Sequence, residues 1–275
     1  MKDPEPRENL DSTDGPPAEE RAADTGEDAV PGDAAVAGAI EQPADFERYH
    51  GEMVRYYDNP SNEARNTHEA MWARHYRKEF ETPGNWLREV ALALQEAVRG
   101  RDVLELACGH CRWTPFVAEV AKSVLATDLA PSMLHWGQCL FYYAAPRARN
   151  VRFRLADAYR PDLIEGDFSA ASVVNFFQHI PVTKQRPFLS LLGEKIGAGG
   201  TVFLAANHLK GRFREKLQQR GEDLFSRRRR PDGTMYHIID NVFTEHSVRE
   251  LLEPFGADVR YTSGEEYWWV TYTVR

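Results

Sequence analysis

Cysteine is scarce in this chain, and long apolar runs are absent from it. The three cysteines, Cys108, Cys111 and Cys139, are an odd number, unlike the framework of a disulfide-rich secreted domain. No apolar run approaches the roughly 18 residues that a membrane-spanning helix needs. We therefore expect a protein of the reducing cytoplasm with no membrane contact.

Aromatic residues are missing from the N-terminal stretch, where the first one is Phe46. Between Met1 and Gln42 twelve acidic side chains face three basic ones, so this stretch carries a charge of −9. It cannot bury enough apolar surface to offset the entropy of ordering, and we predict that residues 1–43 form a disordered acidic tail. The negative charge and the lack of an apolar core argue against a secretory signal.

An excess of positive charge is also lacking. The net charge of the chain is −8, so the residues after the tail carry about +1. A near-neutral fold gives no general reason to expect nucleic acid or another acidic surface as a partner. The run Arg227–Arg230 could attract an anionic substrate or a phosphate, but we expect it to be a solvated loop.

From Trp86 to Val98, apolar residues recur at helical spacing, which predicts a helix that Gly100 ends. Short apolar strands then alternate with helices. The expected strands are residues 103–106, 123–128, 151–157, 171–177 and 201–206, and the expected helices are 113–121, 132–143 and 186–196. Strands joined by helices favour a parallel sheet that is covered on both faces.

The C-terminal part adds a polar stretch and the end of the sheet. Residues 208–240 are expected to form a lid, residues 243–252 a helix, and residues 259–261 and 267–272 an antiparallel hairpin. The predicted fold is α/β: a Rossmann-like, doubly wound, seven-stranded and mostly parallel sheet with an N-terminal helical cap. The expected domain limits are 1–43 for the tail, 44–100 for the cap and first helix, and 101–275 for the Rossmann-like domain.

A binding site is expected where the strands end, because ligands of open parallel sheets bind past the carboxyl ends of the strands. After the first strand, the small residues Ala107 and Gly109 let the backbone turn tightly and approach a ligand. Asp128 follows Glu105 by 23 residues, close to the roughly 20-residue offset at which an acid accepts hydrogen bonds from a ribose diol. Asp157 ends the third strand, where it can accept from an adenine amino group.

These residues resemble the class I S-adenosylmethionine-dependent methyltransferase family, whose first motif reads acid-x-Gly-x-Gly-x-Gly. The similarity covers residues 103–206, including Ala126–Leu134, Leu155–Ala158 and Val174–Pro181. It implies S-adenosyl-L-methionine as the cofactor, no metal, and the following cofactor-binding residues: Glu105 for the ammonium group, Ala107 and Gly109 for the loop, Asp128, Leu129 and Met133 for the ribose and adenine, Asp157 and Ala158 for the adenine edge, and Asn175 for the methionine part.

Two of the three family glycines are replaced here, by Ala107 and Cys111. Cys111 is the larger change, since it adds a side chain where the backbone is expected to pass near the methionine part of the donor. The pair Cys108 and Cys111 is also similar to the redox motif of protein disulfide isomerases, but those have Trp before the first Cys, where this chain has Ala107. No second Cys pair supports a zinc site, so we expect buried, inert thiols.

The resemblance implies methyl transfer to an oxygen or nitrogen of a small organic acceptor, natural products among the candidates. His179 is the candidate base, since a pKa near 6.5 suits it to deprotonate a hydroxyl or an amine, although a helix-entry role satisfied by the backbone is the alternative. Tyr57, Trp72 and Tyr76 are candidate substrate-binding walls, with simple packing as their alternative.

Two other functions stay open. One is a non-catalytic cofactor-binding or regulatory protein with a decayed site, which Cys111 and the missing glycines suggest. The other is an enzyme that methylates a protein or a nucleic acid and uses the arginine run as a docking surface.

Overall fold

Short apolar segments form a seven-stranded sheet in the computed structural model, which describes residues 43–58, 85–208, 216–230 and 232–275. All of these fall in one structural unit, Ala39–Arg275. The predicted tail before Pro43, Trp72 and Tyr76 lie outside the described residues. Within the described part, no helix is long and apolar enough to cross a membrane.

The order of the strands places the ligand-binding edge. The strands are β1 (Asp102–Leu106), β2 (Ser123–Asp128), β3 (Val151–Leu155), β4 (Ala170–Val174), β5 (Thr201–Asn207), β9 (Gly256–Ser263) and β10 (Tyr267–Val274). They lie in the order β3-β2-β1-β4-β5-β10-β9, with β1 to β5 parallel and β10 antiparallel to both β5 and β9. The predicted fold class and the C-terminal hairpin are thus confirmed, and the strand order reverses between β1 and β4, where ligands bind.

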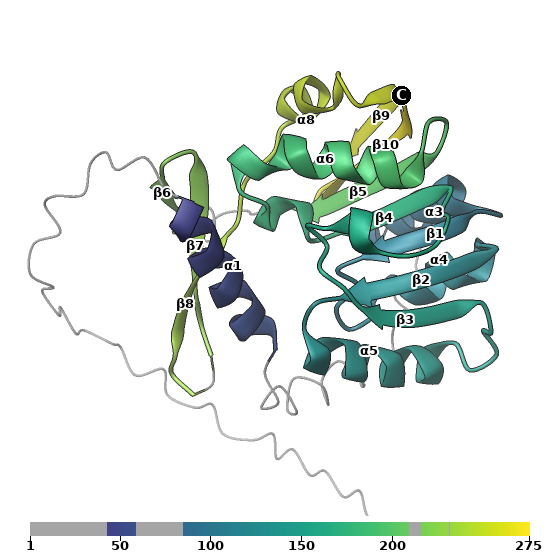
Figure 1. Ribbon diagram of the computed structural model, residues 1–275, viewed down its shortest axis with the longest axis horizontal. Coiled ribbons are helices and arrows are strands. Elements are labelled where there is room, and N and C mark those ends of the chain that lie inside the picture. Colours follow the sequence, from purple (N-terminus) through teal and green to yellow (C-terminus); the bar gives the residue numbers. More distant parts are fainter. Residues whose placement is uncertain (1–42, 59–84, 209–215, 231) are drawn as a thin grey trace, which may run out of the picture. The chain divides into compact units, whose positions relative to one another are not determined.

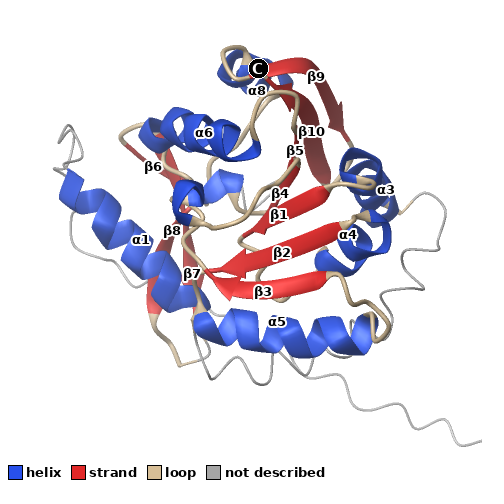
Figure 2. Cartoon of the chain, turned by 45° about the vertical axis from the view of Figure 1, so that its right-hand side comes forward, coloured by secondary structure: helices blue, strands red, loops and turns tan. Residues whose placement is uncertain are grey.

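Helices cover both faces of this sheet (Figure 1). They are α3 (Trp86–Val98), α4 (Thr114–Val120), α5 (Pro131–Ala144), α6 (Val182–Ile196) and α8 (Glu245–Leu252), with the short 3-10 helices η2 (Pro161–Leu163) and η3 (Phe177–His179). Because successive strand residues point to opposite faces, Val103 packs among residues of α3 and its neighbour Leu104 among residues of α6. The carboxyl ends of β1, β2 and β3 point toward a separate group of elements, β7, β8 and α1 (Figure 2).

That group consists of a helix and a small antiparallel sheet from distant parts of the chain. The helix is α1 (Pro43–Tyr57), and the strands are β6 (Gln218–Arg220), β7 (Asp223–Arg229) and β8 (Met235–Ile239), in the order β6-β7-β8. Helix α1 packs along β8, where the Glu52 carboxylate accepts a hydrogen bond from the His237 backbone N–H at 3.3 Å. Within the stretch predicted as a lid, residues 218–220, 223–229 and 235–239 therefore form a second sheet, while residues 209–215 and 231 lie outside the described residues.

The prediction of a solvated loop for Arg227–Arg230 is wrong. Residues up to Arg229 belong to β7, and side chains of a strand alternate between its two faces. Arg227 and Arg229 are exposed, whereas Arg228 and Arg230 are partly buried. The Arg228 guanidinium donates to the Tyr57 hydroxyl of α1, and Arg230 donates to the Tyr56 carbonyl. Four consecutive arginines hide this alternation, since their residue type does not vary with the face.

A glycine in α5 allows the loop after β1 to pass close to this helix. A Cβ added at Gly137 would lie 2.6 Å from the carbonyl oxygen of Gly109 and 2.7 Å from Sγ of Cys111. Atoms do not approach so closely without a shift of the backbone or of the buried thiol. The packing of α5 thus fixes the position of the loop.

We expect Gly137→Ala to lower the free energy of unfolding by about 2–3 kcal/mol, because the added methyl overpacks a site that cannot relax cheaply. Gly193→Ala is the matched control in helix α6, where the added Cβ would meet only Val274 Cγ1 at an ordinary 3.5 Å. There we expect a gain of about 0.5–1 kcal/mol from the better helix former. Urea unfolding of the two variants measures both changes, and equal stabilities would contradict this account.

Candidate active site

A cavity of about 210 Å³ lies at the switch point of the sheet, between the carboxyl ends of the strands and helix α1. Eight of the nine predicted cofactor-binding residues line it: Ala107, Gly109, Asp128, Leu129, Met133, Asp157, Ala158 and Asn175. His179 and Tyr57 line it as well. The tertiary structure therefore brings together residues that the sequence spreads over more than a hundred positions, and only Glu105 of the predicted cofactor set is not part of the wall.

The loop after β1 has three residues in the left-handed region of the backbone map. They are Ala107, Gly109 and Cys111, with φ of 52°, 54° and 55°. These are the positions at which the family motif has glycine, the residue that adopts such angles without strain. Alanine and cysteine there cost roughly 1–2 kcal/mol each. The loop nevertheless keeps the conformation that the motif predicts, so tertiary contacts hold it in place.

Cys111, whose effect on a nearby ligand the sequence left open, is not among the residues that line the cavity. Its side chain is buried against Gly137 in α5, with Sγ 3.8 Å from Sγ of Cys108. The side chain that replaces the family glycine thus occupies space that another glycine leaves empty. The adjacent Cys111 and burial raise the pKa of the Cys108 thiol. Both cysteines are buried, as expected. The seven-stranded fold also differs from the small thioredoxin fold of the redox alternative.

Asp128 ties this loop to the end of β2. Its Oδ2 accepts a hydrogen bond from the Gly109 N–H at 2.8 Å, and its Oδ1 accepts from the Ala130 N–H at 2.9 Å. Burial raises the pKa of this carboxyl, while the two backbone donors act in the opposite direction. An ionised carboxylate has about four acceptor positions, so Asp128 can still accept from a ligand while holding the loop.

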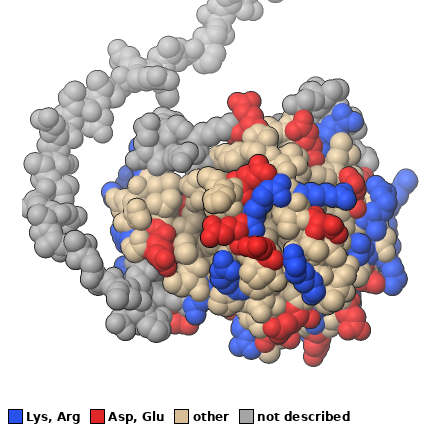
Figure 3. Space-filling model, turned by 90° about the horizontal axis from the view of Figure 1, so that it is seen from above, with Lys and Arg blue, Asp and Glu red and all other residues tan. Residues whose placement is uncertain are grey.

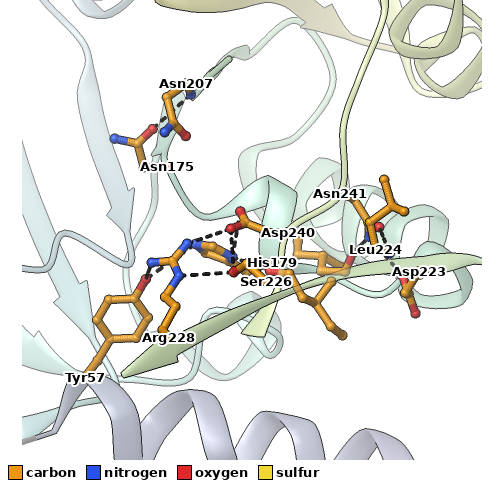
Figure 4. Close-up of polar contacts among 12 residues, drawn as sticks. Tyr57, Asn175, His179, Asn207, Asp223, Leu224, Ser226, Arg228, Asp240 and Asn241 are labelled. Atoms are coloured by element: carbon orange, nitrogen blue, oxygen red, sulfur yellow. Dashed lines mark hydrogen bonds and ion pairs between the residues drawn. The ribbon is translucent and has the colours of Figure 1, made fainter. Parts of the chain in front are cut away.

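Two further wall residues are held by defined hydrogen bonds. Oδ1 of Asp157 accepts from the Tyr159 N–H at 2.9 Å. Asn175 has a φ of 58°, and its Oδ1 accepts from the Asn207 N–H at 3.2 Å (Figure 4). Its Nδ2 donates to the Tyr267 hydroxyl at 2.6 Å. Both side chains are therefore fixed before any ligand arrives, which lowers the entropy cost of binding.

Glu105 lies in β1 behind the cavity wall and is 3% exposed. Its Oε2 has no hydrogen-bond partner in the part of the chain that the structure describes. Burial raises the pKa of Glu105 to about 8, an effect that the nearby Thr114 hydroxyl reduces. A buried carboxyl group without a partner is costly and indicates a missing cationic or hydrogen-bonding group.

His179 ends the short helix η3 and is 5% exposed. Its Nδ1 lies 2.5 Å from the Ile239 carbonyl oxygen, and its Nε2 lies 3.5 Å from the Tyr57 hydroxyl. A carbonyl oxygen can only accept, so Nδ1 carries the proton of the neutral ring and Nε2 is the acceptor. Burial lowers the pKa of His179, which keeps the ring neutral near pH 7. The alternative, a histidine whose hydrogen bonds go to the backbone, therefore holds for Nδ1 but not for Nε2.

Several wall residues were not among the candidates from the sequence. They are His50, Met53 and Val54 of α1, and Cys108, Arg112, Trp113, Ala130, Tyr159, Val174 and Phe176 of the sheet edge. Position relative to the strand ends could have indicated Tyr159, two residues after Asp157. No local signal marks the α1 residues, because their place at the cavity depends on how α1 packs.

Among the described residues, no group of three or more His, Cys, Asp or Glu side chains is placed to hold a metal ion.

The strand order and the helices on both faces of the large sheet define a Rossmann-like fold. Residues 103–200 match the family model described as "Methyltransferase domain". The matched segment runs from β1 to just past the end of helix α6 and includes the loop after β1. A search of curated protein sequences gave no match.

Solved structures show the same fold at low sequence identity. The structure titled "DhpI-SAH complex structure" aligns with a TM-score of 0.59 and 20% identity, covering 82% of this chain and 97% of that one. The 1,6-didemethyltoxoflavin-N1-methyltransferase of Burkholderia thailandensis aligns with a TM-score of 0.51 and 18% identity over 87% and 93%. Magnesium protoporphyrin IX methyltransferase of Synechocystis PCC 6803 aligns with a TM-score of 0.50 and 14% identity, covering 82% of this chain and 100% of that one.

The buried carboxyl group of Glu105 predicts a pH-dependent stability. A folded-state pKa of about 8, above the ordinary value of 4.5, means that the folded chain keeps a proton that the unfolded chain releases. This contribution to stability is complete below pH 4.5 and is lost as the pH rises through 8. Glu105→Gln does not titrate, so its stability relative to the natural chain should be greater at pH 8.5 than at pH 5. The expected difference is about 1.4 kcal/mol or more, the free energy of a tenfold change in proton affinity.

Thermal or urea unfolding of the ligand-free chain at both pH values measures the difference. Glu96→Gln, an exposed residue of α3, is the matched control and should show no such pH dependence. A Glu105→Gln variant whose relative stability does not vary between pH 5 and pH 8.5 would contradict the assignment of a buried, protonated carboxyl group.

Proposed function

We propose that the chain binds S-adenosyl-L-methionine in this cavity and transfers its methyl group to an oxygen or nitrogen atom of a small organic acceptor. The observation that carries this proposal is the convergence of the predicted cofactor residues and the Nε2 acceptor of His179 on one cavity. Packing alone could explain any one of these residues. It does not explain why all of them meet in one cavity at the switch point of a methyltransferase fold.

The residues present fit the cofactor. Glu105 offers a buried carboxyl group that lacks a partner, which suits an ammonium group. Ala107 and Gly109 keep the loop backbone open to a ligand, because a Cβ at Gly109 would already reach Met133 Cε at 3.4 Å. We assign Asp128 to the ribose hydroxyls, Asp157 and Ala158 to the adenine edge, Leu129 and Met133 to the adenine and ribose, and Asn175 to the methionine part.

The acceptor would lie between this site and α1. The helix contributes Met53, Val54 and Tyr57, and the sheet edge contributes Tyr159 and Phe176. Such walls favour a small molecule with an apolar or aromatic body, and a cavity of about 210 Å³ leaves no room for a folded partner. The toxoflavin-precursor and protoporphyrin methyltransferases named above act on small molecules by their titles, which agrees with this acceptor class.

The chemistry that we assign to the chain is mainly positioning. When bound, S-adenosyl-L-methionine supplies an electrophilic methyl group on a sulfonium. Holding an acceptor in line with that group can account for about 7–11 kcal/mol of the barrier. His179 accepts the proton that a hydroxyl or protonated amine must lose, and its neutral ring with Nε2 toward Tyr57 suits this role.

The two alternatives from the sequence lose their main support. The hypothesis of a decayed site rests on Cys111, whose side chain packs away from the cavity. Docking of a nucleic acid on the arginine run would need a continuous basic face, but Arg228 and Arg230 turn inward. On the face shown in Figure 3, basic and acidic side chains are intermixed and do not form a single-sign patch.

A labelled-methyl assay tests the proposal. The chain would be incubated with methyl-labelled S-adenosyl-L-methionine and a panel of small phenols, aliphatic alcohols, anilines and aliphatic amines. We expect label in at least one acceptor class and a loss of about 100-fold or more for an oxygen acceptor in His179→Gln. Cofactor binding by calorimetry without label in any small molecule would contradict the proposed acceptor class.

Asp128 gives a separate prediction for cofactor binding. Asp128→Asn keeps one acceptor oxygen for the loop but loses the charge-assisted bond to the ribose, so its affinity should fall by about 10- to 100-fold, since such a bond contributes about 1.5–3 kcal/mol. Asp128→Ala should abolish binding, because the Gly109 N–H loses its partner as well. Calorimetric titration with S-adenosylhomocysteine measures both, with the exposed Asp167→Asn as control. Unchanged affinity in Asp128→Ala would contradict the assignment.

A further inference from the structure

An ion pair between the buried Asp240 and the partly buried Arg228 lies directly behind the imidazole of His179. Asp240 follows β8 and is 2% exposed, and its Oδ2 accepts from Nη2 of Arg228 at 2.7 Å. The same oxygen accepts from the Ser226 hydroxyl at 2.9 Å (Figure 4). Its other oxygen, Oδ1, lies 3.7 Å from Nδ1 of His179. The carboxylate is therefore hydrogen-bonded on one side and faces the histidine on the other.

Arg228 connects the pair to the cavity side of the same ring. Its Nη1 donates to the Tyr57 hydroxyl at 3.3 Å, and that hydroxyl lies 3.5 Å from Nε2 of His179. The ion pair thus reaches both ring nitrogens, Nδ1 through Asp240 and Nε2 through Arg228 and Tyr57. Figure 4 shows these side chains gathered around the imidazole.

Stability alone does not explain this arrangement. Removing two charges from water is expensive, and an apolar pair of similar volume often packs as well or better. The small sheet already has apolar contacts in Phe225 and Ile239, which are both buried. Such an ion pair next to a candidate base is more readily explained by what it does to the charge of that base.

We propose that Asp240 and Arg228 are positioning residues that act through His179, Asp240 by stabilising the ring when it has accepted a proton and Arg228 by keeping it neutral beforehand. This inference rests on the proposed function, in which Nε2 takes the proton of the acceptor. The proton then resides on the imidazolium, whose Nδ1–H faces the Ile239 carbonyl and the Asp240 carboxylate, and it leaves to solvent after the product does.

The charged and titratable groups around His179 come from three elements. Asp240 and Arg228 belong to the small sheet, Tyr57 belongs to α1, and the Tyr159 hydroxyl of the sheet edge donates to the His179 carbonyl at 3.3 Å. The carboxylate raises the pKa of His179 and the guanidinium lowers it, while burial lowers it most. The two members of the pair therefore act on the pKa of His179 in opposite directions.

Histidine-selective nuclear magnetic resonance of the full chain tests this directly, with the His179 signal assigned from its loss in His179→Gln. Asp240→Asn should lower the pKa of His179 by about one pH unit or more, since it removes a close opposite charge and leaves Arg228 uncompensated. Arg228→Gln should raise that pKa. The pKa of His179 in the double variant should lie between the values of the two single variants. Because the double variant leaves no unpaired buried charge, it also shows whether misfolding explains a shift in either single variant.

Arg227→Gln is the matched control, because it lies on the same strand but is exposed and points to the other face. Its His179 titration should equal that of the natural chain. Shifts of the same sign in both single variants, or none beyond the control, would overturn the inference.

The acid limb of methyl transfer provides a second readout with any acceptor found in the labelled-methyl assay. The base must be deprotonated to act, so the acid limb of the pH–rate profile should move to lower pH in Asp240→Asn and to higher pH in Arg228→Gln. The affinity for S-adenosylhomocysteine should be unchanged in both variants. The magnetic resonance experiment needs no acceptor. Its failure therefore counts against the positioning role, whereas failure of every acceptor counts against the proposed function.

Discussion

The left-handed loop between β1 and α4 is the constraint from which the rest of the site follows. Its backbone turns at Ala107, Gly109 and Cys111 with positive φ, although two of these residues are disfavoured there. Two external contacts hold it: the Asp128 carboxylate bonds the Gly109 N–H, and Gly137 of α5 leaves the space that Cys111 fills. The replacement of family glycines is tolerated because a helix elsewhere is shaped to accept it, and the cavity stays open.

Two buried carboxyl groups flank this cavity in opposite states. Glu105 has no partner for one oxygen among the described residues and holds a proton up to about pH 8. Asp240 is matched by Arg228 and Ser226 and faces His179. The first carboxyl group must lose its proton before it can pair with a cationic ligand, whereas the second already has guanidinium and hydroxyl partners beside the histidine. Burying either carboxyl group removes it from water, which lowers the stability of the fold.

The halves of the cavity also differ in origin. The half assigned to the cofactor comes from consecutive strand ends of the large sheet, within a continuous segment of the chain. The other half comes largely from α1, which packs on the small sheet although more than 150 positions separate the two in the sequence. Coupling of the small sheet to α1 through Tyr57 and Arg228 makes one unit of these distant pieces.

The sequence by itself determined the seven-stranded fold, most element positions and most of the residues that line the cavity at the strand ends, because strands, helix starts and the acids at strand ends have local signatures. It did not determine where Cys111 points, since that depends on Gly137, 26 residues away in α5. Nor did it reveal β7, where four arginines mask the alternation of a strand, or the pairing of Asp240 with His179. Those features depend on which side chains meet across the fold and on which charges are buried. Only the tertiary structure decides both.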